Sequence, residues 1–279
     1  MPGSLTPVMA SHLMGTWKSG TVNISGGYLA FHRTGGDGPA LVLSHGLTDN
    51  GLCWSRFAAT LASEFDIIML DARGHGLSSR ISGVEPFDPA QDIAEAIEQL
   101  GLVAPIVMGH SVGGRATAAY ANAHPDGASK VILEDPAFGP IVDPAASKLR
   151  QERFAGHVAA FQAMSQAQII AKGKSATPSW HDDDFPAWAT AKTQVDPGAM
   201  PIYSKPWQDT VSHIAAPTLL IFGEASHGGM VSPEMAKEAG ELNRAIGTVQ
   251  IKNAGHNIRR ENFADYLAAV RAFLVEDQQ

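Results

Sequence analysis

The strongest chemical signal in the chain is a serine set between glycines. Residues 109–114 read Gly-His-Ser-Val-Gly-Gly, which contains the spacing Gly-x-Ser-x-Gly around Ser111. An apolar run typical of a strand precedes it, and a stretch with helical periodicity follows. Glycines fit a turn so sharp that Cβ atoms would collide there, and such a turn exposes the serine hydroxyl. The pattern predicts a nucleophilic Ser111 between a strand and a helix.

A serine hydroxyl is a weak nucleophile near neutral pH and needs a base, usually a histidine oriented by a carboxylate. The chain has 11 histidines. His256 lies in a loop between the last predicted strand, at 248–251, and the final predicted helix. Since the carboxyl ends of parallel strands meet at one edge of a sheet, this loop shares an edge with Ser111. We predict His256 as the general base.

Two carboxylates compete for the role of orienting acid. Asp135 lies just past a predicted strand, and the following Pro136 stiffens the chain so that the carboxylate can be buried beside the imidazole. This favours Asp135. Glu224, just past another predicted strand, remains the alternative acid, and a purely structural role for Asp135 also stays open. Glu134 should point to the opposite face of the strand.

A second turn is a candidate for stabilising negative charge. His45, Gly46 and Leu47 end the predicted strand 40–44, where backbone N–H groups can turn toward the nucleophile. The N–H groups of Leu47 and Val112 are the predicted oxyanion hole, and His45 is predicted to be structural. The alternative is a tight turn without an anion-binding role.

Composition limits the partners of the chain. It has 279 residues, of which 44% are hydrophobic and 17% charged, and a net charge of −8. This charge gives no attraction to nucleic acid or anionic lipid, so a small-molecule substrate is expected, with no nucleic-acid or membrane partner. The single cysteine, the lack of a leader pattern and the lack of a ~20-residue apolar run predict a cytoplasmic protein. A homodimer is left open.

Short apolar runs alternate with amphipathic stretches, which predicts strands joined by helices over a mostly parallel sheet of the α/β class. A hairpin at 19–33 should lie on the sheet edge. The other strands are predicted at 40–44, 66–70, 105–108, 130–133, 217–222 and 248–251. Helices are predicted at 52–62, 91–100, 116–123, 233–242 and 263–273.

This rhythm stops at 139–207, where alanine, glutamine and aromatic residues dominate. We interpret the segment as a helical cap, and residues 1–138 with 208–279 as the core domain. Its large apolar side chains should pack down on the core. The cap aromatics Trp180 and Trp188, together with His110 and Phe138, are predicted to line a substrate pocket above Ser111.

The motifs together resemble the α/β-hydrolase family in its usual order. They are His45-Gly46, the Asp71–Ser78 segment, the turn at Ser111, and Gly255-His256. The resemblance covers nearly the whole chain and implies an eight-stranded, mostly parallel sheet flanked by helices, with a helical cap after strand six. It also implies that Arg73 and His75 belong to the scaffold.

The sequence departs from the commonest family pattern at the acid. That pattern has an aspartate three residues after the glycine that ends strand seven, and Ser226 stands there instead. An aspartate after strand six combined with Gly-Glu-x-Ser is similar to the acetamidomethylene-succinate amidohydrolases. This likeness is a clue to the acid and not to the substrate.

The leading hypothesis is therefore a serine hydrolase that cleaves an ester, lactone or amide of a small, partly hydrophobic substrate through an acyl-enzyme on Ser111. No cofactor and no metal are expected, because the acidic run at 181–184 is interpreted as a solvated helix start. The alternatives are a receptor-like binding module and a lyase or perhydrolase on the same scaffold. Dehalogenases and epoxide hydrolases need an acidic nucleophile, which argues against both.

Overall fold

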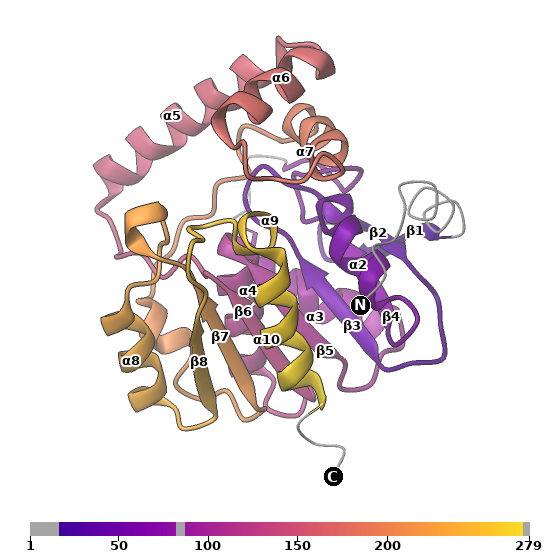
Figure 1. Ribbon diagram of the computed structural model, residues 1–279, viewed down its shortest axis with the longest axis vertical. Coiled ribbons are helices and arrows are strands. Elements are labelled where there is room, and N and C mark those ends of the chain that lie inside the picture. The colour runs from indigo at the N-terminus through magenta and orange to yellow at the C-terminus, as the bar shows by residue number, and fades with distance from the viewer. Residues whose placement is uncertain (1–16, 82–86, 276–279) are drawn as a thin grey trace.

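An eight-stranded sheet forms the centre of the molecule (Figure 1). The computed structural model describes residues 17–81 and 87–275. The strand order is β1-β2-β4-β3-β5-β6-β7-β8, with β1, β2 and β4 paired antiparallel and the remaining pairs parallel. The strands are β1 Lys18–Ile24, β2 Gly27–Arg33, β3 Ala40–Ser44, β4 Asp66–Leu70, β5 Ile106–His110, β6 Lys130–Glu134, β7 Thr218–Phe222 and β8 Ile246–Gln250. This arrangement confirms the predicted fold class.

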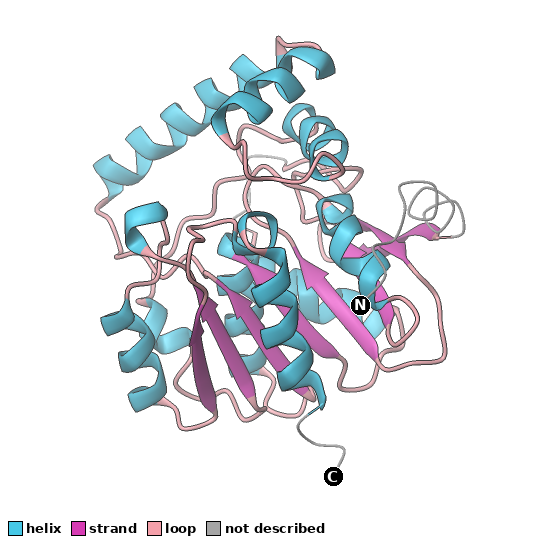
Figure 2. Cartoon of the chain, in the orientation of Figure 1, coloured by secondary structure: helices cyan, strands magenta, loops and turns pink. Residues whose placement is uncertain are grey.

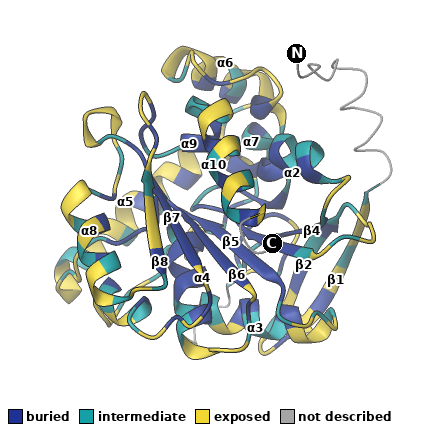
Figure 3. Ribbon diagram, turned by 60° about the horizontal axis from the view of Figure 1, so that its bottom comes forward, coloured by how far each residue is buried: buried dark blue, intermediate teal, exposed yellow. Residues whose placement is uncertain are grey.

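Helices cover both faces of the sheet, so β4 to β7 are buried along their whole length (Figures 2 and 3). Alternate strand residues point to opposite faces. Thus Val42 joins the core under α3, α4 and α8, whereas Leu41 and Leu43 join the core under α2 and α10. The helices are α2 Ser55–Leu61, α3 Pro89–Gln99, α4 Ser111–Ala123, α8 Pro233–Leu242, α9 Ile258–Glu261 and α10 Phe263–Val275, with a short 3-10 helix η1 at Gly51–Trp54.

Three helices between β6 and β7 lie beyond the carboxyl ends of the strands (Figure 1). They are α5 Pro144–Gln162, α6 Gln166–Ala176 and α7 Asp184–Thr193. Local sequence starts two of them: the Asp143 side chain accepts from the Ala146 N–H, and Ser165 forms a capping box with Gln168. We keep 139–207 as the proposed cap and 1–138 with 208–279 as the proposed core domain.

Within residues 17–81 and 87–275, the helices are all too short or too polar to span a bilayer. Helices α5, α6 and α7 together bury a small apolar cluster. Phe161, Ile169 and Ala189 are buried there, with Trp188 packed against them. The carboxyl edge of the sheet therefore lies between the loops of the core and helices α5, α6 and α7 (Figure 1).

Candidate active site

Ser111 is the first residue of α4 and follows β5 without a linker. Its φ is 55°, a left-handed conformation that is uncommon for a residue with a side chain. The neighbouring glycines make the turn feasible. A Cβ at Gly109 would lie 2.4 Å from the Gly113 carbonyl oxygen, and a Cβ at Gly113 would lie 2.4 Å from that of His45. The strained turn presents the Ser111 hydroxyl at the carboxyl edge of the sheet.

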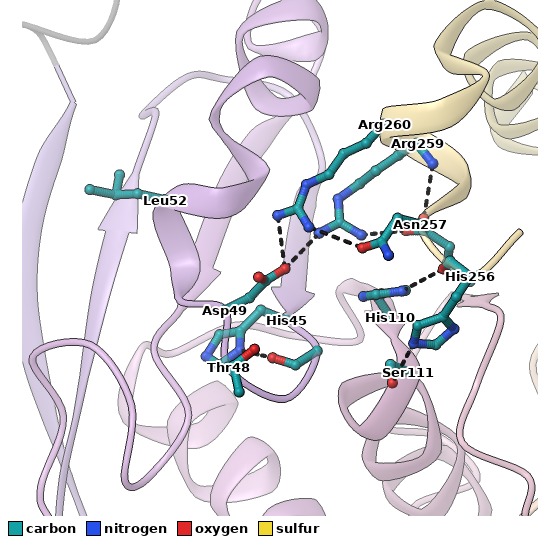
Figure 4. Close-up of polar contacts among 12 residues, drawn as sticks. His45, Thr48, Asp49, Leu52, His110, Ser111, His256, Asn257, Arg259 and Arg260 are labelled. Atoms are coloured by element: carbon teal, nitrogen blue, oxygen red, sulfur yellow. Dashed lines mark hydrogen bonds and ion pairs between the residues drawn. The ribbon is translucent and has the colours of Figure 1, made fainter. Parts of the chain in front are cut away.

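Ser111, His256 and Asp135 form a continuous hydrogen-bonded chain. The Ser111 Oγ lies 3.0 Å from His256 Nε2, and His256 Nδ1 lies 2.6 Å from Asp135 Oδ2. The three residues come from the start of α4, the loop after β8 and the end of β6. Figure 4 shows the His256 ring pointing at Ser111. This geometry allows a proton to pass from the serine hydroxyl to the imidazole.

Asp135 is fully buried and also takes a left-handed conformation, with φ 37°. Besides His256, its carboxylate accepts hydrogen bonds from the Met230 N–H at 2.8 Å and the Val231 N–H at 3.0 Å. The Asp135 N–H donates to the Ile221 carbonyl at 2.8 Å. Two backbone amides beside the imidazole satisfy the buried carboxylate and fix its direction.

Glu224, the alternative acid, points elsewhere. Its Oε2 accepts from the Asn253 N–H at 2.8 Å and pairs with His227 Nδ1 at 3.3 Å, and the side chain is half-buried. Ser226 lies 3.3 Å from the same His227 nitrogen. Glu224 therefore braces the loops after β7 and β8, while Asp135 contacts the imidazole of His256.

The predicted oxyanion turn packs directly on Ser111. The Asp49 N–H donates to the Gly46 carbonyl at 3.1 Å and closes a turn with Leu47 and Thr48 at its centre. A Cβ on Gly46 would lie 3.3 Å from the Ser111 Cβ, so the backbone passes close to the nucleophile. Opposite it, Val112 occupies the first turn of α4, where backbone N–H groups have no helical partner. The role of Leu47 and Val112 as donors stays a prediction.

His110 lies behind His256 with its ring centroid 4.7 Å from that of His256. Burial first, and then the charge of Arg259, hold the pKa of His110 well below its usual value, so the ring is neutral. Its Nε2 lies 2.8 Å from the His256 carbonyl oxygen, and a neutral ring donates a hydrogen bond there. These contacts support the backbone of His256, and a pocket role for His110 stays a prediction.

The predicted pocket aromatics lie in three places. Phe138 stacks on Trp207 with centroids 4.6 Å apart, and both line an open hollow near Met230. Trp180 lies under the guanidinium of Arg260, 4.6 Å from its ring centroid. Trp188 packs edge-on against Phe161, inside the apolar cluster of α5, α6 and α7. Their role as pocket walls stays a prediction.

An apolar cavity of about 50 Å³ borders the first turn of α4. Val112 and Gly113 line it from the core, and Ala199 and Pro201 line it from the chain that returns from α7. His75, which also lines it, has a pKa lowered to about 3 by burial and is therefore neutral. The cavity offers space for a small uncharged group beside the predicted oxyanion hole.

The Asp71–Ser78 segment supports this region from below. Arg73 forms two hydrogen bonds with Asp92, at 3.0 and 2.6 Å. The Asp71 carboxylate accepts from the Gly51 N–H at 2.7 Å and the Leu77 N–H at 2.8 Å. These bonds join the segment to α3 and η1, so its charged residues act as scaffold.

A buried ionic network lies beside the site and was not predicted from the sequence. Asp49, which is nearly inaccessible to solvent, contacts Lys192 of α7 at 3.3 Å, Arg259 at 3.2 Å and Arg260 at 2.8 Å. Burial alone would raise the pKa of Asp49, but Arg260, Lys192 and Arg259 hold it well below its usual value. No local motif marks these residues, because Lys192 and Asp49 are far apart in the sequence.

The profile of the alpha/beta hydrolase fold family matches residues 39–262, and the chain belongs to this family. It is similar to N-formylmaleamate deformylase of Pseudomonas putida, with 27% identity over 91% of this chain and 96% of the relative. It is also similar to 2-(acetamidomethylene)succinate hydrolase of Mesorhizobium japonicum, with 26% identity over 87% of this chain and 90% of the relative.

A solved structure of E-2-(acetamidomethylene)succinate hydrolase superposes with a TM-score of 0.75 at 24% identity, covering 92% of this chain and 99% of that one. At this identity the likeness concerns the fold. The family and its hydrolase relatives identify the chain as an enzyme of the hydrolase type, and they confirm the resemblance stated from the motifs.

Proposed function

We propose that this enzyme cleaves a carboxylic amide or ester through a covalent acyl-enzyme on Ser111. The observation that carries the proposal is the chain of contacts from Ser111 Oγ through His256 to Asp135, at 3.0 and 2.6 Å. Ser111 attacks the substrate carbonyl while His256 Nε2 takes its proton. The buried Asp135 carboxylate stabilises the imidazolium that forms.

The oxygen of the carbonyl becomes negative in the tetrahedral intermediate. The N–H groups of Leu47 and Val112 bind it in our proposal, because both belong to backbone turns that flank Ser111. When the intermediate collapses, His256 gives its proton to the leaving amine or alcohol. His256 then takes a proton from water, and the resulting hydroxide attacks the acyl carbon. When this second intermediate collapses, the bond between the acyl carbon and Ser111 Oγ breaks, His256 returns its proton to Oγ, and the carboxylic acid is released.

Among the ester, lactone and amide substrates that the motifs allow, we favour an amide with a small acyl group. Both relatives described above are named for compounds with an N-formyl or an acetamido group, joined to a maleamate or succinate carboxylate skeleton. The apolar cavity of about 50 Å³ beside Val112 offers room for a short acyl chain next to the first turn of α4. The substrate class is therefore a short N-acyl amide of a small carboxylate.

The direct test is Ser111→Ala, with Ser226→Ala as the matched control in the exposed 3-10 helix Ala225–His227. On p-nitrophenyl acetate, Ser111→Ala should lose at least ~10³-fold in kcat, and Ser226→Ala should keep the activity of the wild type. A fluorophosphonate probe should add its mass to Ser111. Undiminished turnover by Ser111→Ala would refute the mechanism, and a wild-type chain that does not react with the probe would favour the receptor-like alternative.

A further inference from the structure

Lys192 is a buried lysine whose polar contacts converge on the predicted oxyanion turn. It lies in the last turn of α7 and is 6% exposed, which is rare for lysine. Its Nζ donates to the Thr48 carbonyl at 3.0 Å, lies 2.7 Å from Thr48 Oγ1 and contacts Asp49 Oδ1 at 3.3 Å. The ring of Trp188, one turn earlier, lies 4.8 Å from Nζ. The ammonium therefore joins the proposed cap to the turn beside Ser111.

The turn needs such support because Thr48 is strained. Its φ is 67°, in the left-handed region that glycine and asparagine adopt and that a β-branched residue disfavours. Residues stay in this region only when their surroundings hold them there. Lys192 bonds both the carbonyl and the hydroxyl of Thr48, so it holds the backbone and the side chain of the strained residue.

Asp49, which Lys192 contacts, also binds two arginines that follow His256 in the chain. Asp49 shares its second carboxylate oxygen between Arg259 and Arg260, which follow His256 by three and four residues. Figure 4 shows both guanidinium groups directed at Asp49, on the far side of His110 from Ser111. A single buried carboxylate thus connects α7, the oxyanion turn and α9, the helix that begins two residues after the general base.

We propose that Lys192 is a positioning residue that holds the turn Gly46–Asp49 in the conformation that places the Leu47 N–H toward the oxyanion. The inference rests on the proposed function. Because the ammonium comes from α7, the oxyanion hole is complete only when the cap is seated on the core. Without the Lys192 ammonium, the backbone of Thr48 relaxes and the Leu47 N–H is displaced. Loss of one such donor lowers kcat by about 10²–10³-fold.

The test compares Lys192→Met with Lys174→Met, an exposed cap lysine paired with Asp182. On p-nitrophenyl acetate, Lys192→Met should lower kcat by ~10²-fold and change KM by less than ~3-fold. A trifluoromethyl ketone, which forms an oxyanion adduct with serine, should bind more weakly by the same factor as kcat/KM falls. Lys174→Met should match the wild type in all three measurements.

A double-mutant cycle separates positioning from a general loss of packing. Glycine adopts the Thr48 conformation without strain, so Lys192→Met should cost at least ~10-fold less in the Thr48→Gly background. An equal cost in both backgrounds, or an unchanged affinity for the ketone, would overturn the inference. If Lys192→Met does not fold, Thr48→Val takes its place, because it removes only the hydroxyl that Lys192 contacts. Thr48→Val should lower kcat by ~3–10-fold. A wild-type kcat in Thr48→Val would then overturn the inference.

These outcomes are distinguishable from failure of the proposed function. If Ser111→Ala abolishes turnover while Lys192→Met keeps wild-type kcat, the mechanism stands and the role of Lys192 falls. If Ser111→Ala keeps turnover, both fall together.

Discussion

Glu134 and Asp135 are neighbours at the end of β6, yet their carboxylates contact different parts of the chain around His256: Asp135 the His256 ring, Glu134 the helices α9 and α10 that follow it. Asp135 contacts the ring of His256 at 2.6 Å, and Glu134 accepts from the Arg259 N–H at 3.0 Å and from the Tyr266 hydroxyl at 3.1 Å. The left-handed backbone at Asp135 separates the two directions. The Asp135 carboxylate therefore faces the proposed catalytic groups, and the Glu134 carboxylate is held by buried hydrogen bonds away from them.

The first prediction assigns the acid. Asp135→Asn should lower kcat by ~10⁴-fold, because an amide cannot stabilise the imidazolium and favours the wrong tautomer of His256. Glu224→Gln should change kcat by less than ~3-fold, since the Glu224 carboxylate contacts Asn253 and His227. Steady-state kinetics on p-nitrophenyl acetate measure both. The reverse ranking would reassign the acid to Glu224. As a control for folding, both variants should unfold at temperatures near that of the wild type.

The second prediction concerns stability. Glu134→Gln should lower the free energy of unfolding by about 3–5 kcal/mol, because it leaves the buried Arg259 without the charge that faces its Nη1 at 3.1 Å. The control is Glu64→Gln. Glu64 pairs with the half-exposed Arg271, and loss of this pair should lower the free energy of unfolding by under ~1 kcal/mol. Urea unfolding measures both. If Glu134→Gln lowers the free energy of unfolding as little as Glu64→Gln does, the contact between Glu134 and Arg259 is not strongly stabilising.

The sequence predicted the fold well because each buried strand is marked by its own residues. The runs 40–44 and 66–70 coincide with β3 and β4, and the runs at 130–133 and 217–222 fall within one residue of β6 and β7. Strands buried on both faces need continuous apolar residues, and this is a local property. The order of the motifs along the chain then indicated the family that the comparison confirms.

The choice of acid was not decidable from local patterns. Asp135 and Glu224 each follow a strand, and which one faces His256 depends on the backbone of Asp135 and on the amides of Met230 and Val231. Those amides lie in a loop about 95 positions away. The network around Asp49 was missed for the same reason, because tertiary packing alone brings its charges together.

The third prediction concerns the single cysteine. Burial, with a contribution from Asp49, raises the pKa of Cys53 to about 12. A raised pKa means less thiolate, so at about pH 8 the reactive form should be ~1,000-fold rarer than for a free thiol. Ellman's reagent should leave the native enzyme almost unmodified and should titrate one thiol per chain in denaturing guanidinium chloride. Rapid reaction of the native enzyme would contradict the burial of Cys53 beside the ionic network.

The fourth prediction tests how closely the oxyanion turn is packed. A Cβ at Gly46 would lie 2.6 Å from His110 Nδ1 and 3.3 Å from the Ser111 Cβ, and both neighbours are buried and cannot retreat. Gly46→Ala should therefore shift the turn and lower kcat by ~10²-fold. Gly156→Ala is the control, because a Cβ in that part of α5 meets nothing within 4 Å. It should keep kcat and raise the free energy of unfolding by up to ~1 kcal/mol. Wild-type kcat in Gly46→Ala would mean that the turn has room to move and does not set the position of the Leu47 N–H.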